Sequence, residues 1–284
     1  MPDRAGIASV GVCLLIALSG VVPGAPLMMA ANRDERYARP AVAMTTLRAT
    51  GPRILGGRDQ VAGGTWLAVN EHGVVAGLTN RPSAGGPVAT RRSRGEIPLA
   101  LAAHRTAAEA VTALRDTLDP AAYNSCWLLV GDRQQLFFAE IAGGPRPVVQ
   151  ELGPGVHILE NAPLRARSAK AERVAALVAA ERAAARDGAA AETPLAVTEA
   201  LAAVLRDHRP AVPSSGPAVA GPDGRPLPPA ISAACVHTGE YGTRSSLIVA
   251  VPDDGRPVLR VADGPPCQSP LLDVSRLWSG PALV

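Results

Sequence analysis

The stretch that decides the fold is Met28-Met29-Ala30-Ala31-Asn32-Arg33-Asp34-Glu35. It begins as an apolar run, passes through two small residues and ends in four polar residues, of which three are charged. A buried strand that ends in an amide, a guanidinium and two carboxylates carries polar groups to the edge of a core, where functional sites are commonly built. A strand followed by a solvated turn is the alternative that this stretch alone leaves open.

Composition limits the class of protein. The chain has 284 residues, of which 47% are hydrophobic, so it can bury a large core and is too apolar to be disordered throughout. The net charge is only +3 and no basic stripe with interleaved aromatics occurs, which argues against nucleic-acid binding. Lys170 is the only lysine among 28 basic residues, a bias that we attribute to codon usage.

Cysteines and histidines give no metal signal in the linear sequence. The cysteines form no C-x-x-C pair, and no histidine stands at the usual ligand spacing from one. We therefore expect no zinc site, no other cofactor and no disulfide framework, and the scattered cysteines favour a reducing compartment. The histidines are also scattered, and each is more typical of a surface or strand residue than of a catalyst. The four cysteines are Cys13, Cys126, Cys235 and Cys267.

The first 31 residues resemble an export signal in part. Arg4 precedes a weakly apolar run, and Met29-Ala30-Ala31 resembles a cleavage site. Glycines and prolines between Gly20 and Pro26 interrupt the run, so no continuous membrane helix exists. We expect a cytoplasmic protein without an integral membrane segment, and an export signal within residues 1–31 is the alternative.

Groups of strands alternate with pairs of helices along the chain. Apolar runs and alternating patterns predict strands, and apolar residues at helical spacing predict helices. Because the two kinds of element are segregated, we expect an α+β fold with two stacked, mainly antiparallel sheets and helices outside them. The expected strands are residues 13–18, 27–31, 65–69, 74–79, 123–130, 135–141, 148–152, 156–159, 231–236, 245–251 and 258–261. The expected helices are residues 93–105, with a capping box at Ser93 and Glu96, 107–118, 168–186 and 194–208.

The remaining segments define the domain organisation. Residues 36–53 look irregular, and residues 54–59 and 63–64 look like glycine-rich connections. We expect an N-terminal extension at residues 1–12, a single domain at residues 13–264 and a loosely tied tail at residues 265–284. Within the domain, residues 210–229 are crowded with proline, glycine and serine, which predicts a mobile loop.

Five polar or nucleophilic residues fall at the expected strand ends. Cys13 begins the first strand, Arg33 and Asp34 end its expected neighbour, and Asn80 and Asn161 end two others. A guanidinium favours the thiolate form of a nearby cysteine, and a carboxylate can orient an amine or thiol. Asparagine amides can donate to an oxyanion, which contributes about 3 kcal/mol in some enzymes. Each residue also has a structural explanation, as a small core residue or a strand-end cap, so the joint placement carries the hypothesis.

At this point the sequence resembles the NRDE family, which includes the transport and Golgi organisation protein 2 group. The tetrapeptide Asn32-Arg33-Asp34-Glu35 is the motif from which that family takes its name. Further blocks occur in family order over about residues 13–250. They are Arg39-Pro40, Gly56-Gly57-Arg58-Asp59, Gly63-Gly64-Thr65-Trp66-Leu67, Leu78-Thr79-Asn80, Ser93-Arg94-Gly95, Leu129-Val130-Gly131-Asp132, Asn161-Ala162 and Tyr241-Gly242-Thr243-Arg244-Ser245.

The resemblance implies an N-terminal-nucleophile-hydrolase-like fold with four layers in the order αββα. It also implies a cysteine that follows the initiating methionine and uses its own α-amine as base. The implied catalytic residues are Cys13 as nucleophile, Arg33, Asp34, and Asn80 and Asn161 at the oxyanion site. Asn32 and Arg244 are the implied binding residues.

This chain departs from the family pattern before Cys13, which follows Val12 and eleven further residues instead of an initiating methionine. Either translation starts at Val12 from a GTG codon, or residues 1–12 are a propeptide removed autocatalytically. The resemblance then implies a cysteine amidohydrolase that cleaves a linear C–N amide bond in a small molecule. The alternative is a non-catalytic protein that handles a ligand in haem or acyl-CoA and lipid metabolism and trafficking.

Overall fold

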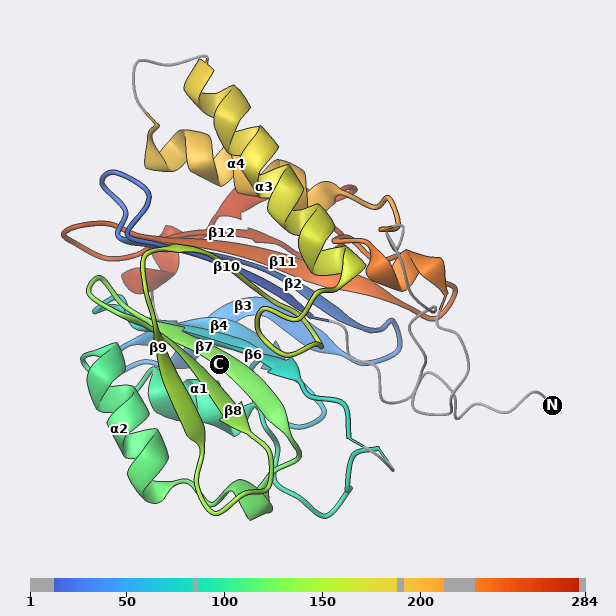
Figure 1. Cartoon of the computed structure of the whole chain (residues 1–284). Coiled ribbons are helices and arrows are strands. Elements are labelled where there is room, and N and C mark those ends of the chain that lie inside the picture. The colour runs from blue at the N-terminus through green and yellow to red at the C-terminus, as the bar shows by residue number, and fades with distance from the viewer. Residues whose placement is uncertain (1–12, 84–85, 188–191, 212–227, 281–284) are drawn as a thin grey trace.

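Two antiparallel sheets stack face to face, and a pair of helices covers the outer face of each (Figure 1). The computed structural model describes residues 13–83, 86–187, 192–211 and 228–280. This arrangement is the αββα sandwich that we expected. The first sheet runs in the order β10 (Gly155–Leu159), β1 (Leu14–Ser19), β2 (Leu27–Arg36), β11 (Tyr241–Val251), β12 (Val258–Ala262) and β13 (Leu272–Asp273). The second runs in the order β3 (Ala41–Arg48), β4 (Ile54–Asp59), β5 (Leu67–Asn70), β6 (Val75–Asn80), β7 (Cys126–Gly131), β8 (Leu136–Ile141) and β9 (Val148–Leu152).

The outer layers are formed by α3 (Ala169–Asp187) and α4 (Pro194–Arg206) on the first sheet, and by α1 (Glu96–Leu101) and α2 (Ala107–Thr117) on the second. The described residues also include three short 3-10 helices: η1 (Pro120–Ala122), η2 (Pro229–Ser232) and η3 (Ser275–Trp278). No helix among the described residues combines the length and the apolar character needed to cross a bilayer.

The hairpin of β1 and β2 lies at the centre of the first sheet and is buried on both faces. Leu15 and Met29 pack against the second sheet, whereas Leu14 and Met28 pack against α3 and α4. Successive side chains of a strand point to opposite faces, so a strand with two buried faces is apolar without alternation. This burial explains the continuous apolar runs that predicted both strands.

Two strands occur where the sequence suggested irregular or connecting segments. β3 and β4 form one edge of the second sheet, and the register between them shifts twice. β3 is only partly buried and carries mixed side chains, so it lacks a clear alternation. In β4 the glycines allow close approach, because a Cβ atom on Gly57 would lie 2.0 Å from the ring of Trp66. Both features hide a strand from pattern analysis.

Two other expectations were wrong in type or length. The expected strand at residues 231–236 is instead η2 followed by an irregular segment. The expected helix at residues 93–105 shortens to α1, and no capping box forms, because the Ser93 hydroxyl accepts from the backbone N–H of Gly95. The expected extension at residues 1–12 and most of the expected loop, residues 212–227, lie outside the described residues.

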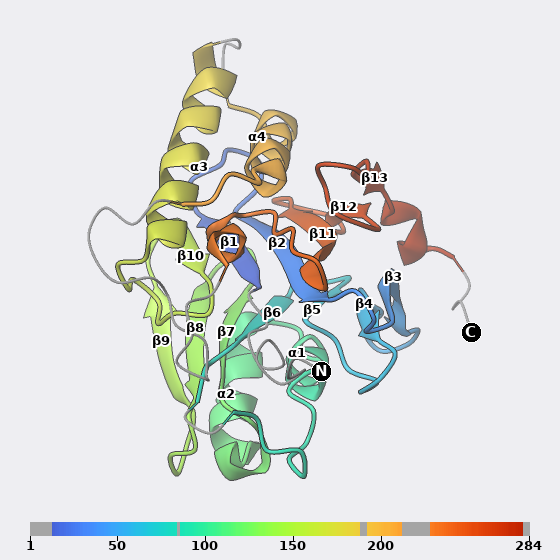
Figure 2. The same ribbon diagram turned by 90° about the vertical axis from the view of Figure 1, so that its right-hand side faces the viewer.

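The C-terminal segment is packed more closely than a loose tail. β13 pairs with β12, and η3 places Trp278 in the core between the two sheets with 5% of its surface exposed. The indole nitrogen of Trp278 donates to the carbonyl of Pro257 at 2.7 Å. Figure 2 shows this segment, in red, at the side of the molecule where β12 and β3 approach each other. Residues up to 280 therefore belong to the folded body.

Candidate active site

A cavity of about 1350 Å³ opens where strand ends of the two sheets meet. The five residues that the sequence suggested as catalytic all line it: Cys13, Arg33, Asp34, Asn80 and Asn161. Cys13 stands before β1, Arg33 and Asp34 lie near the end of β2, Asn80 ends β6, and Asn161 follows β10. The Thr79 hydroxyl donates to the Glu160 carbonyl at 2.9 Å and so joins the ends of β6 and β10 across the two sheets.

The register of β1 and β2 sorts the polar residues onto two faces. Leu14 pairs with Asn32, which places Cys13 next to Arg33 along the hairpin. Arg33 lies toward the second sheet, with its guanidinium 4.6 Å from the centre of the Trp66 ring. Asn32 and Asp34, one residue to either side, lie toward the helices. Alternate residues of β2 therefore face the second sheet and the helix layer of α3 and α4.

Cys13 is held through its backbone nitrogen and its sulfur. The N–H of Cys13 donates to the Asn161 Oδ1 atom at 3.2 Å, and the backbone N–H of Asp34 donates to the sulfur. The pKa of the Cys13 thiol is raised to about 11, first by burial and then by the negative charge of Asp34. The positive charge of Arg33 lowers this pKa by less than Asp34 raises it. The thiolate that the sequence suggested is therefore not the resting form, and Cys13 needs a base to become a nucleophile.

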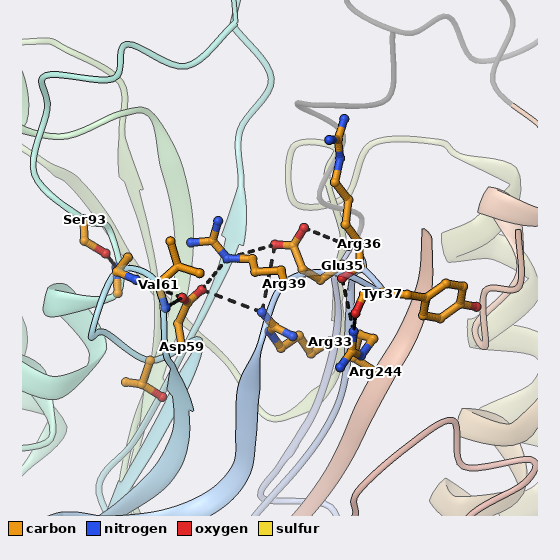
Figure 3. A network of polar contacts seen from close by, with 12 residues as sticks. Arg33, Glu35, Arg36, Tyr37, Arg39, Asp59, Val61, Ser93 and Arg244 are labelled. Carbon is orange, nitrogen blue, oxygen red and sulfur yellow. Dashed lines mark hydrogen bonds and ion pairs between the residues drawn. The ribbon is translucent and has the colours of Figure 1, made fainter. Parts of the chain in front are cut away.

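Arg33 belongs to a network of charged side chains on one wall of the cavity (Figure 3). Its Nη2 atom lies 3.7 Å from Asp59 Oδ2 and 4.0 Å from Glu35 Oε2. Arg39 joins the same two carboxylates, with its Nε atom 2.7 Å from Asp59 and 3.7 Å from Glu35. Burial alone would raise the pKa of Asp59, but hydrogen bonds from Arg39 and from two backbone N–H groups lower it.

The guanidinium of Arg33 is buried but not saturated. Its Nη1 and Nη2 atoms make no hydrogen bond to any residue that the structure describes. A buried guanidinium nitrogen without a hydrogen bond is unfavourable, and an acceptor group in the cavity would satisfy it. Arg33 is thus positioned to receive a carbonyl or carboxylate oxygen.

Asp34 is the centre of a second polar group, on the helix face. Its Oδ1 atom accepts from the Thr243 hydroxyl at 2.5 Å, and its Oδ2 atom lies 3.7 Å from the Nζ atom of Lys170 in α3. Burial raises the pKa of Asp34 to about 7, although Lys170 and Thr243 both oppose this rise. The linear sequence did not identify Lys170, Trp66 or Asp59 as residues of the site. The only signal for Lys170 was that no other lysine occurs.

Asn32 and Arg244 do not line the cavity. The Asn32 amide donates to the carbonyls of Leu205 at 3.0 Å and Ala234 at 2.7 Å, and its oxygen accepts from Ser246. Arg244 lies at the register shift in β11 and donates to the backbone carbonyls of Arg36 and Tyr37. These contacts give both side chains a structural role.

Comparison with known proteins places this geometry in context. The family model described as "Transport and Golgi organisation 2" matches residues 12–259. The chain belongs to the Transport and Golgi organisation 2 family. It is 31% identical over 242 residues to a Transport and Golgi organization protein 2 homolog of Bos taurus, a match covering 81% of this chain and 83% of that protein. The homolog of Homo sapiens is 30% identical over 245 residues with the same coverage.

The fold of this Transport and Golgi organisation 2 family member also resembles solved hydrolases. A mutant of the conjugated bile acid hydrolase from Clostridium perfringens aligns with a TM-score of 0.52 and 10% identity, covering 93% of each chain. A second variant of that hydrolase aligns with a TM-score of 0.51 and 11% identity over the same share of both chains. At this identity the likeness establishes the N-terminal-nucleophile-hydrolase-like fold.

Proposed function

We propose that the mature protein is a cysteine N-terminal-nucleophile amidohydrolase that cleaves a linear C–N amide bond. The observation that carries the proposal is that two hydrogen bonds hold Cys13 at the cavity wall, one at its nitrogen and one at its sulfur. Its nitrogen lies 3.2 Å from Asn161 Oδ1, while its sulfur accepts from the Asp34 backbone beside Arg33. Cys13 therefore places a nitrogen and a sulfur together at the wall of the cavity.

The raised pKa of Cys13 determines which base the reaction needs. With a thiol pKa of about 11, the thiolate fraction at neutral pH is on the order of one in ten thousand. An α-amine has a pKa of about 8, which suits it to take the thiol proton near neutral pH. This amine exists only if Cys13 is the first residue. The family match starts at residue 12, which supports translation from Val12 and removal of the initiating residue to expose Cys13.

The reaction would proceed through an acyl-enzyme intermediate. The α-amine accepts the thiol proton, the Cys13 sulfur attacks the amide carbonyl, and the Asn80 amide donates to the oxyanion. The intermediate collapses to a thioester while the α-ammonium gives its proton to the leaving amine. Water, deprotonated by the α-amine, then cleaves the thioester and releases a carboxylic acid. Asn161 positions the amine through the hydrogen bond seen at the Cys13 nitrogen.

The charge of the cavity indicates the class of substrate. Eight basic side chains line it against five acidic ones among the described residues, and Arg33 offers two unsatisfied nitrogens. An excess of positive charge attracts anions and raises their local concentration. The proposed substrate is therefore an amide that carries a negative charge, such as an N-acyl amino acid.

The size of the cavity favours a second function. About 1350 Å³ exceeds the usual range of roughly 300–1,000 Å³ for small-molecule sites. A bulky anionic ligand such as haem or an acyl-CoA would fit this combination of size and charge without any hydrolysis. In that case Cys13 would line a binding site and its reactivity would not matter.

The test uses protein expressed from a methionine placed directly before Cys13, with its removal verified by intact mass. N-acyl amino acids and neutral N-acyl amides are assayed for release of the amine. We expect hydrolysis of the acidic amides, abolished by Cys13→Ala and reduced about 100- to 1,000-fold in kcat by Asn80→Ala.

The matched control is Cys126→Ala, because Cys126 is a buried thiol on the helix face of the second sheet. It should leave the rate unchanged. The catalytic proposal is wrong if the Cys13→Ala variant still hydrolyses the amides. It is also wrong if natively expressed protein is active and retains Met1. Binding of haem or an acyl-CoA that is equal in wild type and Cys13→Ala, with no hydrolysis by either, would favour the second function.

A further inference from the structure

Two cysteines and a histidine meet near the start of β11, outside the residues that line the cavity. Cys235 and His237 lie on the segment that leads into β11, and Cys267 lies in the loop after β12. The Cys235 and Cys267 sulfurs are 3.7 Å apart, and the His237 Nε2 atom lies 3.5 Å from the first and 3.1 Å from the second. The sequence analysis found no histidine at ligand spacing from a cysteine, but Cys235 and His237 form a Cys-x-His pair and the fold brings Cys267 to it.

These three distances are close to the edges of a metal coordination tetrahedron. Zinc binds thiolate sulfur at about 2.3 Å and imidazole nitrogen at about 2.0–2.1 Å. A tetrahedron with those bond lengths has a sulfur–sulfur edge of about 3.8 Å and nitrogen–sulfur edges of about 3.5 Å. The observed triangle differs from this by a few tenths of an ångström on its nitrogen side. One ion could therefore bond all three atoms with little rearrangement.

Backbone hydrogen bonds hold the ligand-bearing segments independently of any metal. The Cys235 N–H donates to the Asp207 carbonyl at 2.8 Å, and the Val236 N–H donates to the Thr243 hydroxyl oxygen at 2.8 Å. On the other side, the Arg206 Nε atom donates to the Pro266 carbonyl at 3.2 Å, next to Cys267. Ligands on fixed segments lose little conformational entropy on binding, which favours a functional metal site over a chance contact.

We propose that Cys235, His237 and Cys267 bind a Zn²⁺ ion. Two thiolates and a neutral imidazole balance its charge, and binding releases the two thiol protons. Cys235 is buried, whereas Cys267 and His237 are partly exposed, so the ion can enter from solvent. His208 lies near the three ligands, with its exposed ring edge-on to that of His237 at a centroid distance of 6.2 Å. Water or His208 completes the coordination.

The site is linked to the cavity through one side chain. The Thr243 hydroxyl accepts from the Val236 N–H, between two of the metal ligands, and donates to Asp34. An ion that fixes residues 235–237 also fixes the hydroxyl that orients Asp34. The zinc proposal does not depend on hydrolysis, since it predicts metal binding whether or not Cys13 is catalytic.

The test is a titration of the reduced full-length chain with Zn²⁺ in competition with a chromophoric chelator. We expect one ion per chain, and Co²⁺ in its place should give a thiolate-to-cobalt charge-transfer band. Cys267→Ser and His237→Ala should each weaken the affinity at least about 100-fold, since even partners of metal ligands contribute 10- to 100-fold. Cys126→Ala removes a buried thiol elsewhere and should bind as wild type does.

Three results would overturn the proposal. The first is that the reduced wild-type chain does not bind Zn²⁺ stoichiometrically. The second is that Co²⁺ gives no charge-transfer band. The third is that both ligand variants keep the wild-type affinity for Zn²⁺. The cobalt spectrum of the wild-type protein keeps the test decisive even if a ligand variant fails to fold. A Cys235–Cys267 disulfide in protein purified without oxygen, detected by mass, would also count against a metal site.

Discussion

At the scale of the residue, the pair of Asp34 and Lys170 shows how the fold keeps a carboxylate available in a dry environment. Lys170 is 3% exposed and lies 3.7 Å from an Asp34 oxygen. Without that charge and the Thr243 hydroxyl, burial would raise the pKa of Asp34 beyond its value of about 7. The carboxylate form near neutral pH therefore depends on a side chain from the helix layer.

Lys170→Met tests this dependence. The variant keeps the length of the side chain and removes the charge, so the Asp34 pKa should rise by about one to three pH units above its value of about 7. An NMR titration of protein with ¹³C-labelled aspartate carboxyls measures it directly. Arg173→Met is the control, because it removes a charge from the same helix whose partner is Asp207. An Asp34 pKa that stays the same in Lys170→Met contradicts the assigned role.

The same shift has a consequence for stability. An acid with a higher pKa in the folded state than in the unfolded chain stabilises the fold fully below the unfolded value of about 4. For Asp34 that contribution is lost as the pH rises through about 7. In Lys170→Met the loss should extend to higher pH, so unfolding in urea at pH 5 and pH 8 should differ more than in wild type.

Residue types at strand ends were a good guide to the cavity and a poor guide to individual roles. Cys13, Arg33 and Asn161 could be placed together, because neighbouring strand ends meet at one edge of a sandwich. Asn32 could not be separated from them, since the face on which a side chain lies depends on the register of β1 and β2. Lys170 lies more than 130 residues from Asp34 in the chain, and no local pattern reports such a contact.

At the scale of the element, β4 controls the wall on which Arg33 rests. Gly57 lies against Trp66, and the ring of Trp66 in turn lies against the guanidinium of Arg33. A cation over an aromatic face gains about 0.5–2 kcal/mol, depending on how far it is desolvated. The absence of a side chain at Gly57 therefore determines where an aromatic ring and a charge can lie.

Gly57→Ala should disturb this contact. Its Cβ atom would lie 2.0 Å from the Trp66 ring, so the ring must move, and overpacking of this kind costs about 1–3 kcal/mol. Urea unfolding gives the cost, and tryptophan fluorescence reports the displaced ring. Gly153→Ala is a suitable control, since an added Cβ there meets nothing within 4 Å. Equal stability of the two variants would show that β4 accommodates the methyl group.

Elements with a buried face were predictable, and those defined by close approach were not. The long apolar pattern of α4 and the hairpin of β7 and β8 appeared near their expected positions. β4 was not recognised, because its glycines allow close packing but contribute nothing to a hydrophobic pattern. The apolar residues near 231–236 predicted a strand, but backbone contacts to Asp207 and Thr243 hold that segment as an irregular connection.

At the scale of the whole molecule, the C-terminal segment closes the edge of the sandwich. Trp278 fills a place between the two sheets, and the Arg53 side chain donates to the carbonyls of Leu277 and Gly280. These contacts join the last described residues to the second sheet, although β13 belongs to the first. The segment therefore ties the two sheets together on the side away from the helices of both layers (Figure 2).

Trp278→Ala should destabilise the whole molecule. Removing a buried tryptophan costs about 3–5 kcal/mol, and the Pro257 carbonyl would lose its hydrogen bond as well. The free energy of unfolding in urea measures this loss. Leu272→Ala, at a side chain that is 60% exposed, should change it by less than about 0.5 kcal/mol. If Trp278→Ala lowers the free energy of unfolding no more than Leu272→Ala does, the C-terminal segment is only loosely attached.

The two-faced end of β2 limits how this chain can be redesigned. β2 is paired on one side with β1 and on the other with β11, so its phase is fixed by two neighbours. Inserting one residue between Leu27 and Ala31 would exchange the faces, sending Arg33 toward the helices and Asp34 toward the second sheet. Substitutions can therefore be tried one at a time along this strand, whereas insertions and deletions there would invert the cavity wall and the layer behind it in a single step.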